Sequence, residues 1–583
     1  MRKQYRLPMA AFLVVLGGCS GGGGGGVGST PSPTPAPTPT NTSLSDLRYN
    51  QTFATDAASG TTVIATPAPA LVTGPNTTMR STIQVRYDAN SQSYTIDGPG
   101  RSQSFTPADI QTGSQPGETH YFKNDGSVRD YLTLAVLPYT SNTPNQYVGL
   151  GYWQRNTGSG GVQNTSYDSF VYGFDTPGAA MPKTGSAGYA TDTLGFVTTP
   201  GKAPRAFTGA GTFNVDFGLA LFSAQTSVTE YDLTSSETLT GGGLEFSARG
   251  HLGSGNGFTG NFTYSGRDTT VSGTIGGRFY GPGAEEMGAS FSADNAAGAA
   301  VTGSLTGKRD ASVLPVNLAL TNVVADQLFY ASESEVILGR GPNPPGASHG
   351  IGQFTLRADG GLSIIGPTSS IDYAIYTVAD RVNDPRANFI TYQKTINGIP
   401  TQISLYRPGS ANSELALTYT SFVDWSTSTS NNYGAVPVHL FFSYGIETER
   451  SLLARRTGTA SYAGIAYGVG VRNDGLNYDV RGTSHFDVDF STQHFTGSLA
   501  LNGTPKDGSA ATDFGAWTFA NPLSAGMMVE SALSHAGAGF GGISPRFYGP
   551  DGEEIGGSFY IQNGAQGAPN TVHIAGATVA KRQ

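Results

Sequence analysis

Two pairs of adjacent glutamates are the residues of this sequence that come closest in type and spacing to a catalytic pair. Glu285-Glu286 and Glu553-Glu554 each offer two carboxyl groups, and general acid/base catalysis needs two such groups with separated pKa values. Neighbouring residues on a strand point to opposite faces, however, so the carboxyl groups of each pair are directed apart. Because the pair recurs in the same motif at two places, the sequence favours a structural role in a hairpin over catalysis.

A second candidate for chemistry is a row of metal-binding residue types on one predicted strand. His485, Asp487 and Asp489 share one face of this strand, and imidazole and carboxylate groups are metal ligands. This spacing permits a metal site, although we favour a solvated outer face. The other histidines lack His-x-His or His-Glu-x-x-His spacing, and the sequence has no Gly-x-Ser-x-Gly elbow and no phosphate-binding loop. The sequence therefore predicts a protein that is not an enzyme, and it indicates neither a cofactor nor a metal.

Cys19 is the only cysteine among the 583 residues, and it follows a short apolar segment near the N-terminus. Three basic residues precede the apolar run 9–16, which is too short to span a bilayer core of about 30 Å but suits a secretory signal. The run ends in Leu16-Gly-Gly-Cys19, which resembles the bacterial lipobox, where cleavage occurs before a cysteine that is then lipid-modified. We therefore predict a signal peptide over 1–18 and lipidation of Cys19.

The residues after the anchor predict a tether. Ser20 stands where lipoproteins retained in the inner membrane of enteric-type bacteria usually carry Asp, so the outer membrane is favoured. The glycine run 21–26 and the Pro/Thr segment 31–40 combine flexible coil with stiff polyproline II, and neither can build a core. No later run of about 18 apolar residues exists. The lipid anchor is therefore the only predicted contact with the membrane, and the tether would hold the folded part away from the lipid surface.

Composition indicates a β protein and excludes one class of partner. The chain contains 82 Gly, 28 Tyr and 30 Phe but only 13% charged residues, which favours strands joined by tight turns. Its net charge of -9 provides no basic field for phosphate backbones. Nucleic acid is therefore excluded as a predicted partner.

The sequence contains an internal duplication. Arg278–Phe291 recurs as Arg546–Phe559 at an offset of 268 residues, and Phe213–Phe217 recurs as Phe486–Phe490 at an offset of 273. Two homologous lobes follow, about 46 to 310 and 311 to 583. Apolar and polar residues alternate in segments separated by Gly, Asn, Asp and Pro clusters, which predicts half-buried strands in a sandwich or barrel.

The repeated motif also carries a family resemblance. Phe-Tyr-Gly-Pro-x-x-x-Glu-x-Gly-Gly-x-Phe, preceded by the Gly-x-Ala-x-Tyr-x-Gly strand at 458–464, is similar to the barrel of transferrin-binding protein B. Factor H-binding protein and related surface lipoproteins share this barrel. The first lobe departs from the strand pattern at Thr191, where the family has Gly. The resemblance implies a mainly β fold with two homologous lobes, each a mixed-strand handle followed by an eight-stranded antiparallel β-barrel.

With this resemblance the sequence divides into six predicted segments. These are a signal peptide (1–18), a lipidated tether (19–45), a first-lobe handle (46–140), a first-lobe barrel (141–310), a second-lobe handle (311–410) and a second-lobe barrel (411–583).

The resemblance implies a surface lipoprotein of the outer membrane that binds an iron source. The ligand would be iron, haem or an iron-carrier protein, and the partner would be a TonB-dependent outer-membrane receptor. A surface adhesin or host-factor-binding lipoprotein without a transport role is the alternative. An integral outer-membrane barrel is disfavoured, because the Cys19 anchor and the long tether would be redundant in one.

Aromatic residues near the middle of the first lobe are the candidates for ligand binding. Tyr147, Tyr152 and Trp153 are followed closely by Tyr167 and Tyr172, and Tyr and Trp are enriched in binding hot spots. Barrel cores and rims are equally rich in these residues. Since the resemblance implies ligand binding in the first lobe, we predict that Tyr147, Tyr152 and Trp153 contact the ligand.

Overall fold

A computed structural model describes residues 40–66, 70–114, 116–138, 143–235, 238–239, 243–339, 344–365, 373–431 and 434–583. Cys19, the predicted signal peptide and most of the predicted tether lie outside these residues. Nearly all described elements are antiparallel strands, and the one α-helix among them is α1 (Arg450–Arg455). No described helix is long and apolar enough to cross a membrane. The predicted mainly β fold is confirmed.

The first-lobe handle is one antiparallel sheet in the order β5-β4-β3-β1-β9-β8-β7-β6, with β2 paired to β1. Alternating apolar side chains from these strands, including Phe53, Val85 and Trp153, form its core. Its strands are β1 (Gln51–Ala65), β2 (Thr77–Ser81), β3 (Gln84–Asp88), β4 (Ser93–Gly98), β5 (Arg101–Phe105), β6 (Glu118–Asp125), β7 (Val128–Ala135), β8 (Val148–Ser159) and β9 (Val162–Gly173).

The first-lobe barrel is closed. Strand β10 pairs with both β11 and β18, and β11 also pairs with β12, so that eight strands form a ring. Phenylalanines such as Phe207, Phe213 and Phe291 fill its interior. The strands are β10 (Ser186–Thr198), β11 (Arg205–Asp216), β12 (Leu221–Asp232), β14 (Glu245–Leu252), β15 (Gly257–Ser265), β16 (Thr270–Tyr280), β17 (Glu286–Asp294) and β18 (Ala300–Arg309), with β13 (Thr238–Leu239) added to β12.

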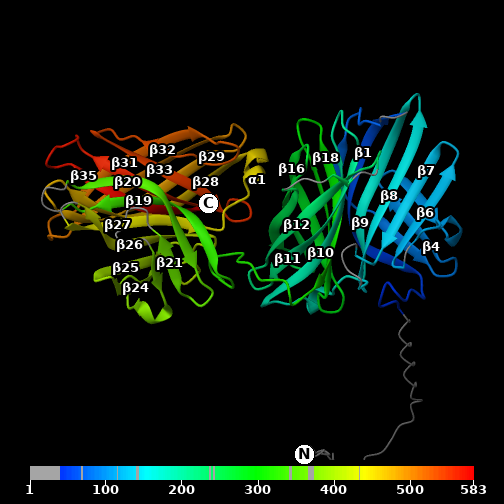
Figure 1. The fold of residues 1–583 in the computed structure, drawn as a ribbon, viewed down its shortest axis with the longest axis horizontal. Coiled ribbons are helices and arrows are strands. Elements are labelled where there is room, and N and C mark those ends of the chain that lie inside the picture. Colours follow the sequence, from blue (N-terminus) through cyan, green and yellow to red (C-terminus); the bar gives the residue numbers. More distant parts are fainter. Residues whose placement is uncertain are drawn as a thin grey trace, which may run out of the picture. The chain divides into compact units, whose positions relative to one another are not determined.

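The second lobe repeats this plan (Figure 1). Its handle sheet has the order β22-β21-β20-β19-β27-β26-β25-β24-β23. These strands are β19 (Gln327–Ile337), β20 (Gly346–Leu356), β21 (Leu362–Ile365), β22 (Ala374–Tyr376), β23 (Arg381–Val382), β24 (Phe389–Ile396), β25 (Ile399–Tyr406), β26 (Thr420–Asn431) and β27 (Gly434–Gly445).

The second-lobe barrel is nearly closed. Its eight strands run in the order β31-β30-β29-β28-β35-β34-β33-β32, and a single bridge between Thr518 and Ser534 joins the two ends. The strands are β28 (Thr459–Arg472), β29 (Asn477–Asp489), β30 (His494–Pro505), β31 (Thr512–Pro522), β32 (Ser531–Leu533), β33 (Gly539–Tyr548), β34 (Glu554–Asn563) and β35 (Val572–Arg582). The predicted architecture of two lobes, each a handle followed by an eight-stranded barrel, is confirmed.

The predicted limits between handle and barrel were placed too early in both lobes. Strands β8 and β9 pair with β7 and β1 of the handle, and the barrel begins only at Ser186. In the second lobe β26 and β27 likewise belong to the handle, and the barrel begins at Thr459. The sequence of these hairpins does not show that they belong to the handle, because their partner strands β1 and β19 lie far away in the chain.

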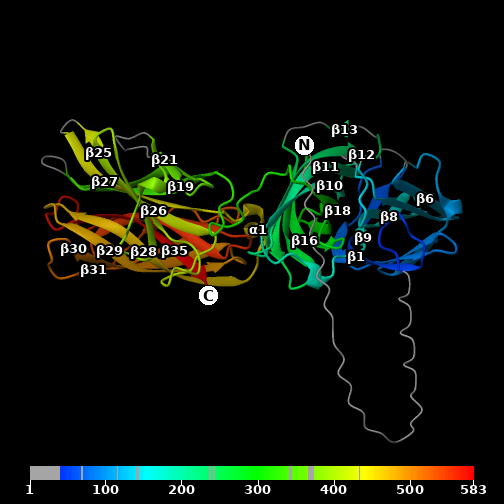
Figure 2. The same ribbon diagram turned by 90° about the horizontal axis from the view of Figure 1, so that it is seen from below.

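Within each lobe the handle packs against its barrel. In the first lobe, β1 and β9 lie beside β18 (Figures 1 and 2). Ser169 of β9 donates a hydrogen bond to Ser304 of β18 over 2.9 Å, and Arg278 of the barrel forms an ion pair with Asp56 of β1 over 2.8 Å. One face of the handle sheet therefore covers the barrel, and the opposite face holds the handle core.

One carboxyl group in the second-lobe handle is buried with an oxygen atom that has no hydrogen-bond partner among the described residues. Glu333 of β19 is 2% exposed, and its Oε2 has no hydrogen-bond partner among the described residues. Burial, aided by the charge of Glu335, raises the pKa of Glu333 to about 8. A carboxyl group whose pKa is raised on folding contributes stability at low pH, and this stability is lost as the pH rises towards the folded-state pKa.

Glu333→Gln should remove this pH dependence. Between pH 5 and pH 7.5 the free energy of unfolding of the wild type should fall relative to the variant by roughly 3 kcal/mol. Urea unfolding at a series of pH values measures the difference, with the exposed Glu449→Gln as the control. Parallel pH profiles of the wild type and Glu333→Gln would show that Glu333 is not held protonated.

Candidate functional site

The three predicted ligand contacts lie on β8 or immediately before it. Successive side chains of this strand alternate between the two faces of the handle sheet. Trp153 points into the handle core, whereas Tyr152 points to the face that packs on the barrel. Tyr147 immediately precedes β8 at the joint between handle and barrel. Tyr167 and Tyr172 are 3% and 2% exposed. The three predicted ligand contacts therefore lie in three different environments.

Trp153 is a core residue. Its side chain has no exposed surface, and its indole Nε1 donates a hydrogen bond to Asp130 over 2.9 Å. The guanidinium groups of Arg101 and Arg155 lie 3.9 and 5.4 Å from its ring centroid, in cation–π contact. This placement contradicts the prediction that Trp153 contacts the ligand, since a buried indole offers no surface to a partner.

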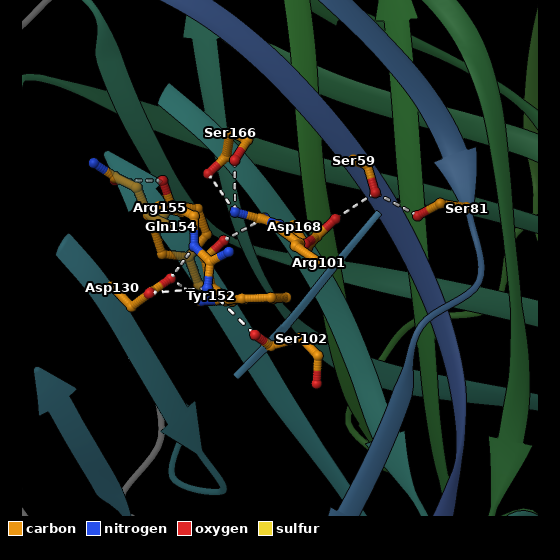
Figure 3. Close-up of polar contacts among 11 residues, drawn as sticks. Ser59, Ser81, Arg101, Ser102, Asp130, Tyr152, Gln154, Arg155, Ser166 and Asp168 are labelled. Carbon is orange, nitrogen blue, oxygen red and sulfur yellow. Dashed lines mark hydrogen bonds and ion pairs between the residues drawn. The ribbon is translucent and has the colours of Figure 1, made fainter. Parts of the chain in front are cut away.

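Two ion pairs hold these guanidinium groups in place (Figure 3). Arg155 contacts both carboxylate oxygens of Asp130, over 2.9 and 3.0 Å. Arg101 pairs with Asp168, and their side chains are only 9% and 1% exposed. Ser59 donates a second hydrogen bond to Asp168. Because each buried charge has its partner, the cluster is a structural unit of the handle core.

We predict that Trp153→Ala destabilises the first lobe. Loss of the buried indole leaves a cavity and removes the contact surface of both guanidinium groups, which should lower the free energy of unfolding by about 3–5 kcal/mol. Tyr131→Ala, at a half-buried position of the same handle, should cost less than about 2 kcal/mol. Urea unfolding of both variants checks the difference. Equal losses would mean that the cluster is not part of the core.

Tyr147 belongs to the joint between handle and barrel. It is half-buried and packs with Val148, Val171 and Tyr280. Its ring lies against Gly281, which has a φ of +88°. A Cβ atom at this position would lie only 2.7 Å from the ring, so a side chain there would clash with Tyr147. The second lobe repeats this contact between Tyr419 and Gly549. Because both lobes build the same joint, the structure gives Tyr147 a structural role.

The second glutamate of each repeated pair closes this joint. Glu286 of β17 accepts hydrogen bonds from the backbone amides of Gln146, Tyr147 and Val148 over 2.8, 2.8 and 3.0 Å. Glu554 of β34 accepts three equivalent bonds over 2.7, 2.8 and 2.9 Å, and the donors are the amides of Thr418, Tyr419 and Thr420. We call this arrangement the carboxylate clamp.

The first glutamate of each pair serves the turn instead. Glu285 accepts a hydrogen bond from the amide of Gly283 over 2.8 Å, and Glu553 accepts one from Asp551 over 2.9 Å. The two carboxyl groups of a pair therefore bind different parts of the lobe. The predicted structural role of both pairs is confirmed.

Tyr152 is the predicted site residue that connects to a surface. Its ring stacks on Phe196 of β10 with centroids 4.1 Å apart, and its hydroxyl donates to Gln154 over 2.8 Å. Burial raises the pKa of Tyr152 well above its usual value, so the hydroxyl stays a neutral hydrogen-bond donor. Tyr152 is half-buried and lies where the handle sheet meets the barrel.

The same face of the sheet continues from Tyr152 onto β7 and β6. Tyr152 is paired with Thr133, which is paired with His120, and His120 Nδ1 lies 3.0 Å from the Thr133 hydroxyl. In the next row Phe122 and Tyr131 are paired, with ring centroids 4.9 Å apart. All five side chains are partly exposed. We call this group of aromatic and polar residues the β6–β8 face.

The β6–β8 face can bind a partner by apolar contact and hydrogen bonds, and the carboxylate of Glu118 lies beside it, 3.4 Å from His120 Nε2. Its rings supply amphipathic area at low entropic cost, and His120 and Thr133 supply polar groups beside them. The sequence-based prediction missed Phe122 and Tyr131. The signal for them was present, because 121–122 and 131–132 are neighbouring pairs of large side chains that must occupy both faces of a strand.

Of the conceivable metal ligands of β29, two lie side by side and the third binds the backbone of the following turn. His485 Nε2 lies 3.1 Å from Asp487, and both side chains are about half exposed, at 49% and 54%. Asp489 accepts hydrogen bonds from the backbone amides of Ser491 and Thr492 over 2.8 and 3.1 Å. This arrangement fits the solvated outer face that we favoured.

Comparison with known protein families bears on both barrels. The family model for the C-lobe and N-lobe beta barrels of Tf-binding protein B matches residues 181–309 and 456–582. These ranges cover β10 to β18 and β28 to β35, the two barrels of the structure.

Solved structures of this group align over most of the chain. A transferrin binding protein B double mutant from Haemophilus parasuis is 17% identical, with 90% of this chain and 95% of that chain covered and a TM-score of 0.27. The intact Ap-TbpB with N and C lobes is 15% identical over the same shares, with a TM-score of 0.26. The isotype 1 protein from serogroup B Neisseria meningitidis is 16% identical, with 82% and 89% covered and a TM-score of 0.25. No curated protein matches the sequence.

Proposed function

Because this chain is transferrin-binding-protein-B-like in both of its barrels, we propose that it is an outer-membrane surface lipoprotein that captures an iron source. The captured source would be an iron-carrier protein or another iron or haem compound, and the lipoprotein would deliver it to a TonB-dependent receptor. The match of the one barrel family to both lobes is the observation that carries the proposal.

Attachment through Cys19 agrees with this function. The lipobox-like sequence and the tether of glycine and Pro/Thr segments precede the first handle strand, which begins at Gln51. A binding protein on such a tether can search the space above the membrane while it remains attached. The structure supplies the other requirement, which is two lobes stabilised by their cores without any disulfide, since Cys19 is the only cysteine.

We place ligand binding on the β6–β8 face of the first lobe. Phe122, Tyr131 and Tyr152 supply aromatic contact area there, while Tyr147 and Trp153 support the face from within the joint and the core. Hydrogen bonding by His120 and Thr133 would add specificity.

Growth on defined iron sources tests the function. A strain of the source bacterium that lacks this gene should fail to grow on one iron source that supports the parent strain. The wild-type gene should restore growth, and a gene with Phe122→Ala and Tyr131→Ala should not. A gene with Phe540→Ala, at a 54% exposed position of the second barrel, is the matched control and should restore growth.

The same experiment distinguishes iron capture from the alternative function, that of an adhesin or host-factor binder. If the deleted strain grows like its parent on every iron source tested, the proposed role in iron capture is wrong. A loss of attachment to host material in that strain would then favour the alternative.

A further inference from the structure

Five large apolar side chains are exposed together on one face of the second-lobe handle. Leu328 and Tyr330 of β19 are 46% and 61% exposed, and Ile351 of β20 is 67% exposed. Ile365 of β21 and Ile375 of β22 are each 38% exposed. We call this group the β19–β22 face.

Strand register places all five on the same side of the sheet. Tyr330 is paired with Gln353, which is paired with Ile365. Leu328 is paired with Thr355 and Thr355 with Ser363. Ser363 is in turn paired with Ile375. Ile351 is paired with Ser332. Directly paired residues share a face, so the five side chains form one patch interrupted only by neutral polar residues.

This side of the sheet is the one that packs against the barrel. Farther along β19, Ser334 donates a hydrogen bond to the backbone carbonyl of Gly576 over 2.9 Å, whereas Phe329 on the opposite side belongs to the handle core. The β19–β22 face therefore continues an internal interface beyond the area that the barrel covers.

The duplication shows that the fold does not require this apolar character. Asn41 and Asn317 each accept hydrogen bonds from the backbone amides of the residues seven and eight positions later in the chain. This shared pattern aligns β1 with β19 at an offset of 276 residues. The buried pair Val85–Ile96 of β3 and β4 corresponds to the buried pair Phe354–Ile364 of β20 and β21, which aligns these strands as well. In this alignment the first lobe carries Thr52, Ala54, Thr82, Asp97 and Ser104 where the second lobe carries Leu328, Tyr330, Ile351, Ile365 and Ile375.

The polarity of the surroundings defines the chemistry of a partner. Gln353, Thr355 and Ser363 between the apolar residues are uncharged. Charged groups near the patch are paired with each other, as Arg546 is with Glu447 and Lys394 is with Asp380. In the first lobe the same face carries the ion pair Arg86–Asp97. Because the positive charges near the patch are paired among the residues that the structure describes, the patch does not suit anionic lipid head groups, but it suits an uncharged apolar protein segment.

The size of the patch argues against a stable dimer of this chain. Five partly exposed side chains present on the order of 400 Å², within the range of roughly 300–600 Å² for the largest patch on a monomer. A stable symmetric interface buries about 800 Å² per partner. The patch therefore fits a transient contact with a smaller apolar surface on a different protein.

We propose that the β19–β22 face of the second lobe is a docking surface for a short, uncharged apolar segment of a partner protein. The two lobes then have different tasks, because the first lobe has alanine or polar residues at the five equivalent positions. The proposal does not depend on which ligand the first lobe binds, so a failure of the iron-capture proposal leaves it intact.

Site-specific photocrosslinking in the source bacterium tests this proposal. Benzoylphenylalanine is introduced into the full-length lipoprotein at Tyr330 or Ile351, and at Ala54 or Thr82 as the matched first-lobe controls. We expect one and the same protein to be crosslinked from Tyr330 and Ile351 but from neither control, through a segment that mass spectrometry identifies as apolar and uncharged. Crosslinks only to a second copy of this chain or to lipid, crosslinks of equal yield from the controls, or no crosslink would overturn the proposal.

A binding measurement with the crosslinked segment as a synthetic peptide completes the test. The variant with Leu328→Thr, Tyr330→Ala, Ile351→Thr, Ile365→Asp and Ile375→Ser carries the residues of the first lobe and should bind the peptide at least tenfold more weakly. Its thermal unfolding shows whether it is folded, and Ile351→Thr alone replaces it if it is not. Unchanged affinity in the folded variant would contradict the proposal.

Discussion

Replacing Cys19, the predicted lipid anchor, by alanine should transfer the protein from the membrane fraction to the soluble fraction. Within the sequence no other segment is predicted to hold the membrane, and the described residues contain no helix long and apolar enough to cross it. Fractionation of cells followed by a carbonate wash measures the effect, which should be a nearly complete transfer from the membrane to the soluble fraction. The released protein should keep its β-rich circular dichroism spectrum, because the lobes begin well after residue 19.

Ser20→Asp is the matched control for the anchor. It leaves the cysteine in place and should move the lipoprotein from the outer to the inner membrane in an enteric-type host without releasing it. If Cys19→Ala protein still fractionates with membranes after the wash, a second attachment exists and the anchor prediction is wrong.

Glu286→Gln should cause a large loss of stability through the carboxylate clamp. The wild-type carboxylate accepts three backbone amides from the segment that leads into β8, and its side chain is buried. Glutamine offers one acceptor oxygen and turns its NH2 group towards an amide donor. With hydrogen bonds to a charged group worth about 1.5–3 kcal/mol each, the loss should reach about 2–4 kcal/mol in urea unfolding.

The neighbouring Glu285→Gln separates the clamp from the turn. Glu285 accepts one amide bond within the turn, so this variant should lose less than about 1 kcal/mol. Glu554→Gln should reproduce the effect of Glu286→Gln in the second lobe, because its three bonds are equivalent. Similar small losses for all three variants would show that the clamp does not hold handle and barrel together.

The fold could be predicted from the sequence because its strongest signals are repeated. The motif of 278–291 and 546–559 spans the β16–β17 and β33–β34 hairpins, and it pointed to a barrel in each lobe. The limits of the handles could not be predicted in the same way. Strand β9 pairs with β1, about a hundred residues earlier, and so draws the β8–β9 hairpin into the handle sheet. Long-range pairing of this kind leaves no local pattern.

The candidate site was predicted only in its neighbourhood. Tyr152 and Trp153 are adjacent, so one of them had to enter the core, and residue type alone does not decide which. In the structure Trp153 lies in the core, and Arg101, Arg155 and Asp130 surround its indole ring. Arg101 is about fifty residues from Trp153 in the sequence, so only the folded sheet reveals this environment.

The central claim is that the first lobe holds the ligand on its β6–β8 face. Titration calorimetry of the soluble Cys19→Ala protein with the iron source identified by the growth experiment tests it most directly. We predict that adding Phe122→Ala and Tyr131→Ala weakens binding by at least about tenfold, a free-energy change of about 1.4 kcal/mol, while adding Leu328→Thr in the second lobe leaves the affinity unchanged. Unchanged affinity in the folded Phe122→Ala and Tyr131→Ala protein, or a loss caused by Leu328→Thr instead, would contradict the claim.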